Sequence, residues 1–150
     1  MADLAPARTV PALRTPEGAI VSESLAIAEE LANRHPEAGL WPEDPLARAT
    51  ARSLAAEMHA GFAPLRAFCP MNLRTGWSGF APGAAVLADL ARIDTIWSRA
   101  LDRSGGPFLY GAYTLADAFY APVATRLATY ALPVSETARA YVETHLAEPN

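Results

Sequence analysis

Two patterns of hydrophobic residues follow one another along this chain, and together they predict a short β-hairpin and then a series of helices. Two brief apolar runs come first, at residues 10–13 and 19–21, with the turn residues Pro16, Glu17 and Gly18 between them. Such runs around a proline and glycine turn are typical of a hairpin. Pro11 lacks a backbone N–H, so its strand is expected at a sheet edge or a bulge.

After the hairpin, apolar residues recur every three or four positions, which predicts helices. The first is expected to run from a Ser22 cap to about His35. A second should open with Asp44 as its cap and Pro45 in its first turn, and continue through a kink at Pro64. Further helices are expected from about residues 84, 114 and 135, and no strand is predicted after residue 21.

Composition excludes several classes of protein. The chain has 150 residues, of which 51% are hydrophobic and 19% charged, so one folded domain, or one and a part, is expected rather than a disordered chain. No apolar stretch approaches the ~20 residues that a membrane helix needs. The single Cys69 allows no internal disulfide and the amino terminus does not resemble a secretion signal, so a cytoplasmic protein is predicted.

The charged residues exclude further classes of protein. The net charge is −4, the pI is near 5.3 and the arginines are scattered, which argues against a nucleic-acid surface. All 12 basic residues are arginine, so a phosphate-loop lysine, a Schiff-base lysine and a lysine general base are excluded. His35, His59 and His145 have no metal-ligand spacing, and no metal site is predicted.

Three separated stretches resemble successive landmarks of the cytosolic glutathione transferase family. They are residues 10–27, the run EMHAGFAPLRAFCPMNLR, and the run PFLYGAYTLADAFYAPVATR, in the family's order and spacing. The resemblance implies a mainly α fold: a partial thioredoxin-like unit over residues 1–36, with only that fold's last two strands and last helix, and an all-helical domain over residues 37–150. It also implies a bacterial chain truncated at both ends, without the first strand-helix-strand unit or the family's last helix.

The same resemblance implies a glutathione site at the start of the chain. Val10, next to Pro11, would offer backbone groups to the cysteinyl part of the tripeptide, provided that the Val10-Pro11 bond is cis. Glu23 would hold the γ-glutamyl ammonium, and Ser24, at a helix N-terminus, its carboxylate. From the local pattern alone, a plain helix-capping cluster is the favoured interpretation of Ser22, Glu23 and Ser24, and only the three motifs in family order reverse that preference.

Other candidate residues have simpler roles. Met58, Phe62 and Arg66 lie on one helical face that, in the family, borders the pocket for the electrophile, although core packing explains Met58 and Phe62 as well. Thr114 and Asp117 fit a capping box, a structural motif. Cys69 is expected to be a small buried residue rather than a nucleophile.

The resemblance implies an enzyme that, when full length, conjugates or reduces small electrophiles with glutathione in detoxification. This chain alone is expected to be catalytically incomplete. No catalytic residue is expected within it, because the family's thiol-activating residue belongs to the first strand or the turn after it. A homodimer is implied as well. The alternative is a non-catalytic binding or assembly module with the same fold.

Overall fold

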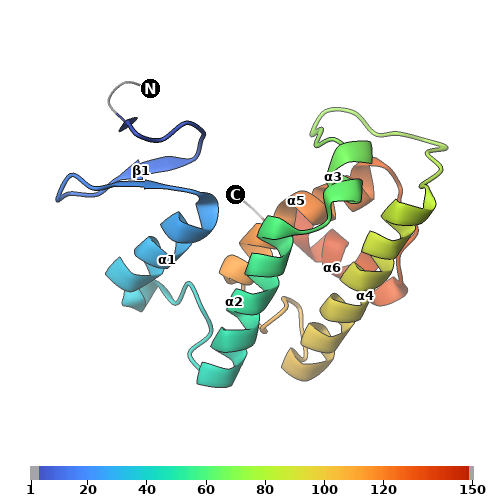
Figure 1. Cartoon of the computed structure of the whole chain (residues 1–150). Coiled ribbons are helices and arrows are strands. Elements are labelled where there is room, and N and C mark those ends of the chain that lie inside the picture. The colour runs from blue at the N-terminus through green and yellow to red at the C-terminus, as the bar shows by residue number, and fades with distance from the viewer. Residues whose placement is uncertain (1–3, 149–150) are drawn as a thin grey trace. The chain divides into compact units, whose positions relative to one another are not determined.

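The computed structural model describes residues 4–148, which form two compact units that divide between Trp41 and Pro42 (Figure 1). The first unit contains a two-stranded sheet and a helix, and the second contains helices. This is the mainly α fold that the sequence predicts, with the partial thioredoxin-like unit preceding the helical part. The assignment of residues 1–36 and 37–150 to two domains of the family stays a prediction.

The first unit is built on the predicted hairpin. Strands β1 (Ala12–Arg14) and β2 (Ile20–Ser22) are antiparallel, with Ala12 opposite Ser22 and Arg14 opposite Ile20. Helix α1 (Ser24–Arg34) follows and packs against both strands, and a short 3-10 helix, η2 (Pro36–Ala38), ends the unit (Figure 1). The strands lie one to two residues later than the apolar runs suggest. The bonds between Thr15 and Ala19 close the turn, and the ladder continues directly from them with Arg14 opposite Ile20.

The turn of the hairpin depends on its own polar and glycine residues. The Thr15 N–H donates to the Ala19 carbonyl oxygen at 2.9 Å, and the Ala19 N–H lies 3.2 Å from the Thr15 hydroxyl. Gly18 has φ +93°, a conformation that favours glycine because it lacks Cβ. The buried Thr15 and the left-handed Gly18 therefore fix the register of both strands.

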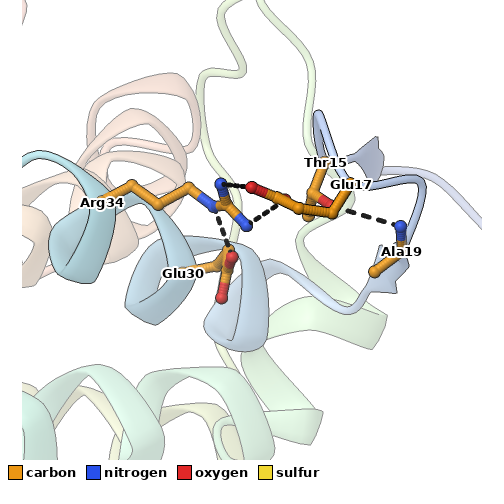
Figure 2. A network of polar contacts seen from close by, with 5 residues as sticks. All are labelled: Thr15, Glu17, Ala19, Glu30 and Arg34. Atoms are coloured by element: carbon orange, nitrogen blue, oxygen red, sulfur yellow. Dashed lines mark hydrogen bonds and ion pairs between the residues drawn. The ribbon is translucent and has the colours of Figure 1, made fainter.

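An exposed polar network joins this turn to α1 (Figure 2). The Arg34 guanidinium donates to both carboxylate oxygens of Glu17, at 3.0 and 2.7 Å, and also pairs with Glu30 one turn earlier on α1. The Arg34 bond, with a smaller contribution from the Glu17 backbone N–H, lowers the pKa of Glu17 to about 2. The last turn of the helix is thus held to the tip of the hairpin.

The second unit consists of five helices within the described residues: α2 (Pro45–Ala60), α3 (Ala63–Phe68), α4 (Ala84–Ser104), α5 (Leu115–Thr129) and α6 (Glu136–Ala147). Helix α5 packs against α2 and α6, while α4 packs against α3 and α6. Two isolated β-bridges lie in the turn of residues 108–112, a local feature that the sequence does not predict. No described helix is long and apolar enough to cross a bilayer.

The helix predicted to continue through Pro64 is instead two helices. Helix α2 ends at Ala60, and Phe62 adopts a left-handed conformation with φ +56° before α3 begins. Pro64 lies in the first turn of α3, where its missing N–H has no intrahelical partner to lose. The Leu65 N–H donates to the Asp89 carboxylate of α4 at 2.9 Å, so a neighbouring helix caps this short one.

The core of the second unit is aromatic and aliphatic. Trp97, Tyr120 and Tyr141 are fully buried, and the Trp97 ring meets the other two rings edge to face at 5.6 and 4.6 Å. Met58 and Leu90 are buried as well, whereas Phe119 of α5 is only partly covered.

Thr114 and Asp117 form the predicted capping box at the start of α5. The Thr114 N–H donates to Asp117 Oδ2 at 2.8 Å, and the Thr114 hydroxyl lies 3.0 Å from the same oxygen. Asp117 is fully buried, and its Oδ1 accepts bonds from the Leu109 N–H at 3.0 Å and the Tyr141 hydroxyl at 2.8 Å. One carboxylate therefore joins the 108–112 turn, α5 and α6.

We expect Asp117→Ala to destabilise the protein much more than Thr114→Ala. Removing the carboxylate leaves the Leu109 and Tyr141 donors buried without an acceptor, a loss of about 3 kcal/mol, whereas a lost cap costs about 1 kcal/mol. The double variant should lose less than the sum, because the two residues share bonds. Urea melts measure all three free energies of unfolding.

Asp44→Ala is the matched control, because Asp44 caps α2 at an exposed position, where its carboxylate accepts from the Ala47 N–H at 2.7 Å. It should cost about 1 kcal/mol. Equal costs for Asp117→Ala and Asp44→Ala would show that the buried bonds to Leu109 and Tyr141 do not stabilise the fold.

Arg34→Gln should return the pKa of Glu17 from about 2 towards its ordinary value of 4.5, since the Arg34 bond is the largest cause of the shift. Because the folded-state pKa is lowered, the contribution of Glu17 to stability is present above pH 4.5 and is lost as the pH falls towards 2. NMR titration of the side-chain carboxyl carbons measures it. Glu37, whose pKa is lowered by its own backbone N–H and by His35, is the internal control and should not change.

Candidate functional site

The four predicted glutathione-binding residues lie at one end of the hairpin. The ladder ends with Ala12 opposite Ser22, so Val10 and Pro11 come just before β1, while Glu23 and Ser24 directly follow β2. The chain segments before β1 and after β2 therefore lie at the same end of the hairpin, where α1 begins. Residues 10–11 and residues 23–24, on either side of the hairpin in the sequence, thus contribute to one end of it.

Val10 presents its backbone at this surface. The Val10-Pro11 peptide bond is cis, as the resemblance requires, and the Val10 residue is 74% exposed. Within residues 4–148, no hydrogen bond to either backbone group of Val10 is found. The N–H and C=O of Val10 are consequently accessible to an extended peptide ligand lying along the edge of β1.

The N-terminus of α1 differs from the prediction in its capping residue. Ser22 was expected to cap the helix, but it belongs to β2, and Glu23 is the N-cap. Glu23 has φ 76° and ψ 126°, a conformation rarely adopted by residues with a side chain, and in the described structure it makes no side-chain capping bond. The plain capping-cluster interpretation of Ser22, Glu23 and Ser24 is therefore not what the geometry shows.

This arrangement suits a ligand that carries both charges. A helix N-terminus has N–H groups and a positive dipole end that favour an anion, and Ser24 is the first residue of α1. The Glu23 carboxylate is exposed beside it and can pair with a cation. An α-amino acid group, with its carboxylate and ammonium two bonds apart, matches this pair of features.

The strained backbone of Glu23 is the feature that sequence reasoning missed. Non-glycine residues with positive φ cost of order 1–3 kcal/mol and gather at functional sites. The only sequence signal is indirect: a strand residue, Ser22, is followed by a helix that starts at Ser24, which leaves a single residue to reverse the chain. Had the strand been extended to Ser22, an unusual conformation at Glu23 would have followed.

The three residues predicted to border the electrophile pocket differ in their exposure to solvent. Met58 and Phe62 are only 6% and 7% exposed, and the Phe62 ring packs against Tyr120. Arg66 is exposed on α3, and its guanidinium donates to the His59 carbonyl oxygen at 3.1 Å. Arg66 is the accessible member of the set, and the pocket role of all three stays a prediction.

The remaining candidate residues lie in structural positions. Cys69 is fully buried, and burial raises the pKa of its thiol, which opposes a role as a nucleophile. The His145 ring packs between Tyr113 and Tyr141, and burial lowers its pKa. Among the described residues, no cluster of three or more His, Cys, Asp or Glu side chains could hold a metal ion.

Comparison with known proteins shows similarity to glutathione transferases. Residues 1–34 match the family model for the glutathione S-transferase N-terminal domain. A glutathione transferase homologue from Burkholderia strain BGR1, crystallised with bound glutathione, is 29% identical with a TM-score of 0.71; the match covers 95% of this chain and 68% of that one. A glutathione transferase from Methylococcus capsulatus is 28% identical with a TM-score of 0.67, covering 98% and 72%.

Two similar curated proteins are named as an isomerase, one of them as a probable one. The maleylacetoacetate isomerase of Pseudomonas aeruginosa is 39% identical over 74 residues, 49% of this chain and 35% of the relative. A probable maleylacetoacetate isomerase of Caenorhabditis elegans is 29% identical over 126 residues, 81% of this chain and 56% of the relative. The chain thus spans between about a third and just over half of these relatives. The chain is thus similar to glutathione transferases in fold, and its residues 1–34 match the N-terminal domain of that family.

Proposed function

We propose that the hairpin end of the first unit binds the γ-glutamyl and cysteinyl parts of glutathione. The observation that carries this proposal is the pairing of β1 with β2, which leaves residues 10–11 and 23–24 at the same end of the hairpin. The α1 N-terminus with Ser24 would take the carboxylate, and Glu23 the ammonium. The backbone N–H and C=O of Val10 would bond the cysteinyl residue as an added strand does.

We propose further that the whole protein transfers glutathione to small electrophiles. The match of residues 1–34 to the N-terminal domain of glutathione S-transferases and the bound glutathione of the similar Burkholderia protein support this activity. The thiol of glutathione reacts as a thiolate, and a hydrogen-bond donor near the sulfur is needed to favour that form. The resemblance implies that this donor would come from the family's first strand or the turn after it, and no residue of this chain is assigned to the role.

Isomerisation of maleylacetoacetate is a second candidate activity, favoured by the names of both curated relatives. Conversion of maleylacetoacetate can be followed by chromatography, and conjugation by the absorbance of the product from 1-chloro-2,4-dinitrobenzene. The two assays on one preparation distinguish the candidates. A non-catalytic assembly module is not favoured by any comparison.

A homodimer in the cytoplasm, with a role in detoxification, is the corresponding proposal for the whole protein. The family resemblance supports it, and the Arg66 side of α3, with Met58 and Phe62, is proposed to border the electrophile. Sedimentation velocity over a range of concentrations tests the dimer: a single species at the monomer mass at all concentrations would contradict it.

We expect glutathione to bind tightly only when this chain is joined to the first strand-helix-strand unit that the resemblance implies for the family. Exposed ion pairs such as that of Glu23 contribute ~0–1 kcal/mol, against an association cost of at least ~4 kcal/mol. Calorimetric titration should therefore show weak or undetectable binding to this chain. Joining it behind the first strand, helix and strand of the Burkholderia transferase should give measurable binding.

Variants of that joined protein test the named residues. Ser24→Ala should weaken glutathione binding about tenfold or more, because it removes a hydrogen bond to a charged group. Glu23→Gln should weaken it by up to about fivefold, the equivalent of one exposed ion pair. Ser22→Ala is the matched control: Ser22 belongs to β2 and pairs through its backbone with Ala12, so binding should not change. Tight binding by the short chain, or equal effects of all three substitutions, would contradict the proposal.

A further inference from the structure

Glu23 has a backbone conformation that the structure around it must maintain. Its φ of 76° lies in the left-handed region that favours glycine, so a glutamate there is strained. Such strain persists only where the neighbouring structure fixes the residue. On one side lies β2, which is paired with β1, and on the other lies α1. The conformation of Glu23 therefore depends on how firmly α1 is held against the hairpin.

Apolar packing alone holds α1 only loosely. The helix packs against both strands of the hairpin. All of its residues are described by the structure, and among them Ala28 alone is buried, at 2% exposed. The larger side chains of Ile27 and Leu31 keep part of their surface exposed. A buried methyl group makes few of the contacts that fix a helix, so the position of α1 depends on its polar contacts as well.

Those polar contacts gather at the last turn of α1 (Figure 2). The Arg34 guanidinium bonds both carboxylate oxygens of Glu17 in the hairpin turn, and it also pairs with Glu30 of α1. Two parallel bonds between a guanidinium and a carboxylate fix direction as well as distance. The Glu17 carboxylate also accepts a bond from the hydroxyl of Thr15, which is only 4% exposed. We call Thr15, Glu17, Glu30 and Arg34 the Arg34 clamp.

Helix α1 connects this clamp to the candidate glutathione site. Its 11 residues span about 16 Å. The clamp holds the helix at its last turn, and the single residue Glu23 joins its first turn to β2. If the last turn were released, α1 could tilt on Ala28 and Glu23 could relax to a negative φ. The first N–H groups of the helix would then turn away from the end of the hairpin.

We propose that the Arg34 clamp positions the glutathione site, because it keeps Glu23 in its positive-φ conformation and so presets the N-terminus of α1 for the γ-glutamyl carboxylate. This inference rests on the proposed function. It makes Arg34 and Glu17 positioning residues, since they lie at the opposite end of the helix and of the hairpin from Ser24. A site whose strained conformation is formed before the ligand arrives binds more tightly than one that must form it on binding.

The first test uses the complete chain without ligand and measures hydrogen exchange by NMR. The Ile27 N–H donates to the Glu23 carbonyl oxygen at 3.0 Å and so reports on the first turn of α1. Arg34→Gln should speed its exchange by about two- to fivefold, the equivalent of one exposed ion pair. The coupling between the amide and α protons of Glu23, which depends on φ, should shift as well. The Thr15 N–H, bonded to Ala19 in the turn, should exchange at an unchanged rate, which shows that the hairpin is intact.

Arg14→Gln is the matched control for this measurement. Arg14 is an exposed arginine of β1 in the same unit, and in the part of the chain that the structure describes no ion pair of its side chain is found. Its substitution removes the same charge and should leave the exchange of the Ile27 N–H unchanged. Arg34→Lys keeps the charge but loses the two parallel bonds, so its effect should lie between those of Arg14→Gln and Arg34→Gln.

The second test measures glutathione affinity by calorimetry in the protein joined to the Burkholderia strand-helix-strand unit. Arg34→Gln and Glu17→Gln should each raise Kd about two- to fivefold. The double variant should raise it no more than either alone, because both substitutions remove the same bonds. In a Glu23→Gly background, where glycine adopts positive φ without strain, Arg34→Gln should no longer change Kd. A clamp that only stabilised the fold would act equally in both backgrounds.

Ser24→Ala separates this inference from the proposed function. If Ser24→Ala weakens binding and Arg34→Gln does not, glutathione binds where proposed but the clamp does not position its site. If neither substitution changes Kd, or if the joined protein does not bind glutathione, the proposed function fails and the inference fails with it. An equal effect of Arg34→Gln with and without Glu23→Gly would also overturn the inference.

Discussion

Asp117 carries a carboxylate into the interior of the helical unit, where water does not reach it and every lone pair must find a donor within the protein. Thr114, Leu109 and Tyr141 supply those donors. Tyr141 in turn lies 3.0 Å from His145, and burial together with the Asp117 charge raises the pKa of its hydroxyl. The start of α5, the turn before it and the middle of α6 are thereby fixed to one another by a single side chain.

The sequence predicts this interaction only in part, and the reason is distance along the chain. Thr114 and Asp117 are three residues apart, a spacing that defines a capping box by itself. Leu109 and Tyr141 are eight and 24 residues away from Asp117, and nothing local marks them as its partners. The same holds for the helices: their periodicity predicts them well, but the Asp89 bond that starts α3 comes from a helix 24 residues later.

The candidate site, too, can be predicted from the sequence only in part. Val10, Pro11, Glu23 and Ser24 can be named from the resemblance, and the hairpin between them from its turn residues. What brings them together is the register of two three-residue strands, which the apolar runs place one to two residues too early. The register depends on Thr15 and Gly18 in the turn. Because the sequence pattern ends the second strand at residue 21, one residue too early, it gives no sign of the positive φ of Glu23.

Helix α4 provides more than a face for the core. Asp89 accepts the Leu65 N–H of α3, and Asp94 accepts the N–H and hydroxyl of Ser135 at the start of α6. A six-residue helix such as α3 is too short to persist alone in water. Its first turn, and that of α6, therefore gain their full complement of bonds only once α4 has formed. One helix therefore supplies acceptors to the starts of two others, and a change that displaced α4 would leave both α3 and α6 without these bonds.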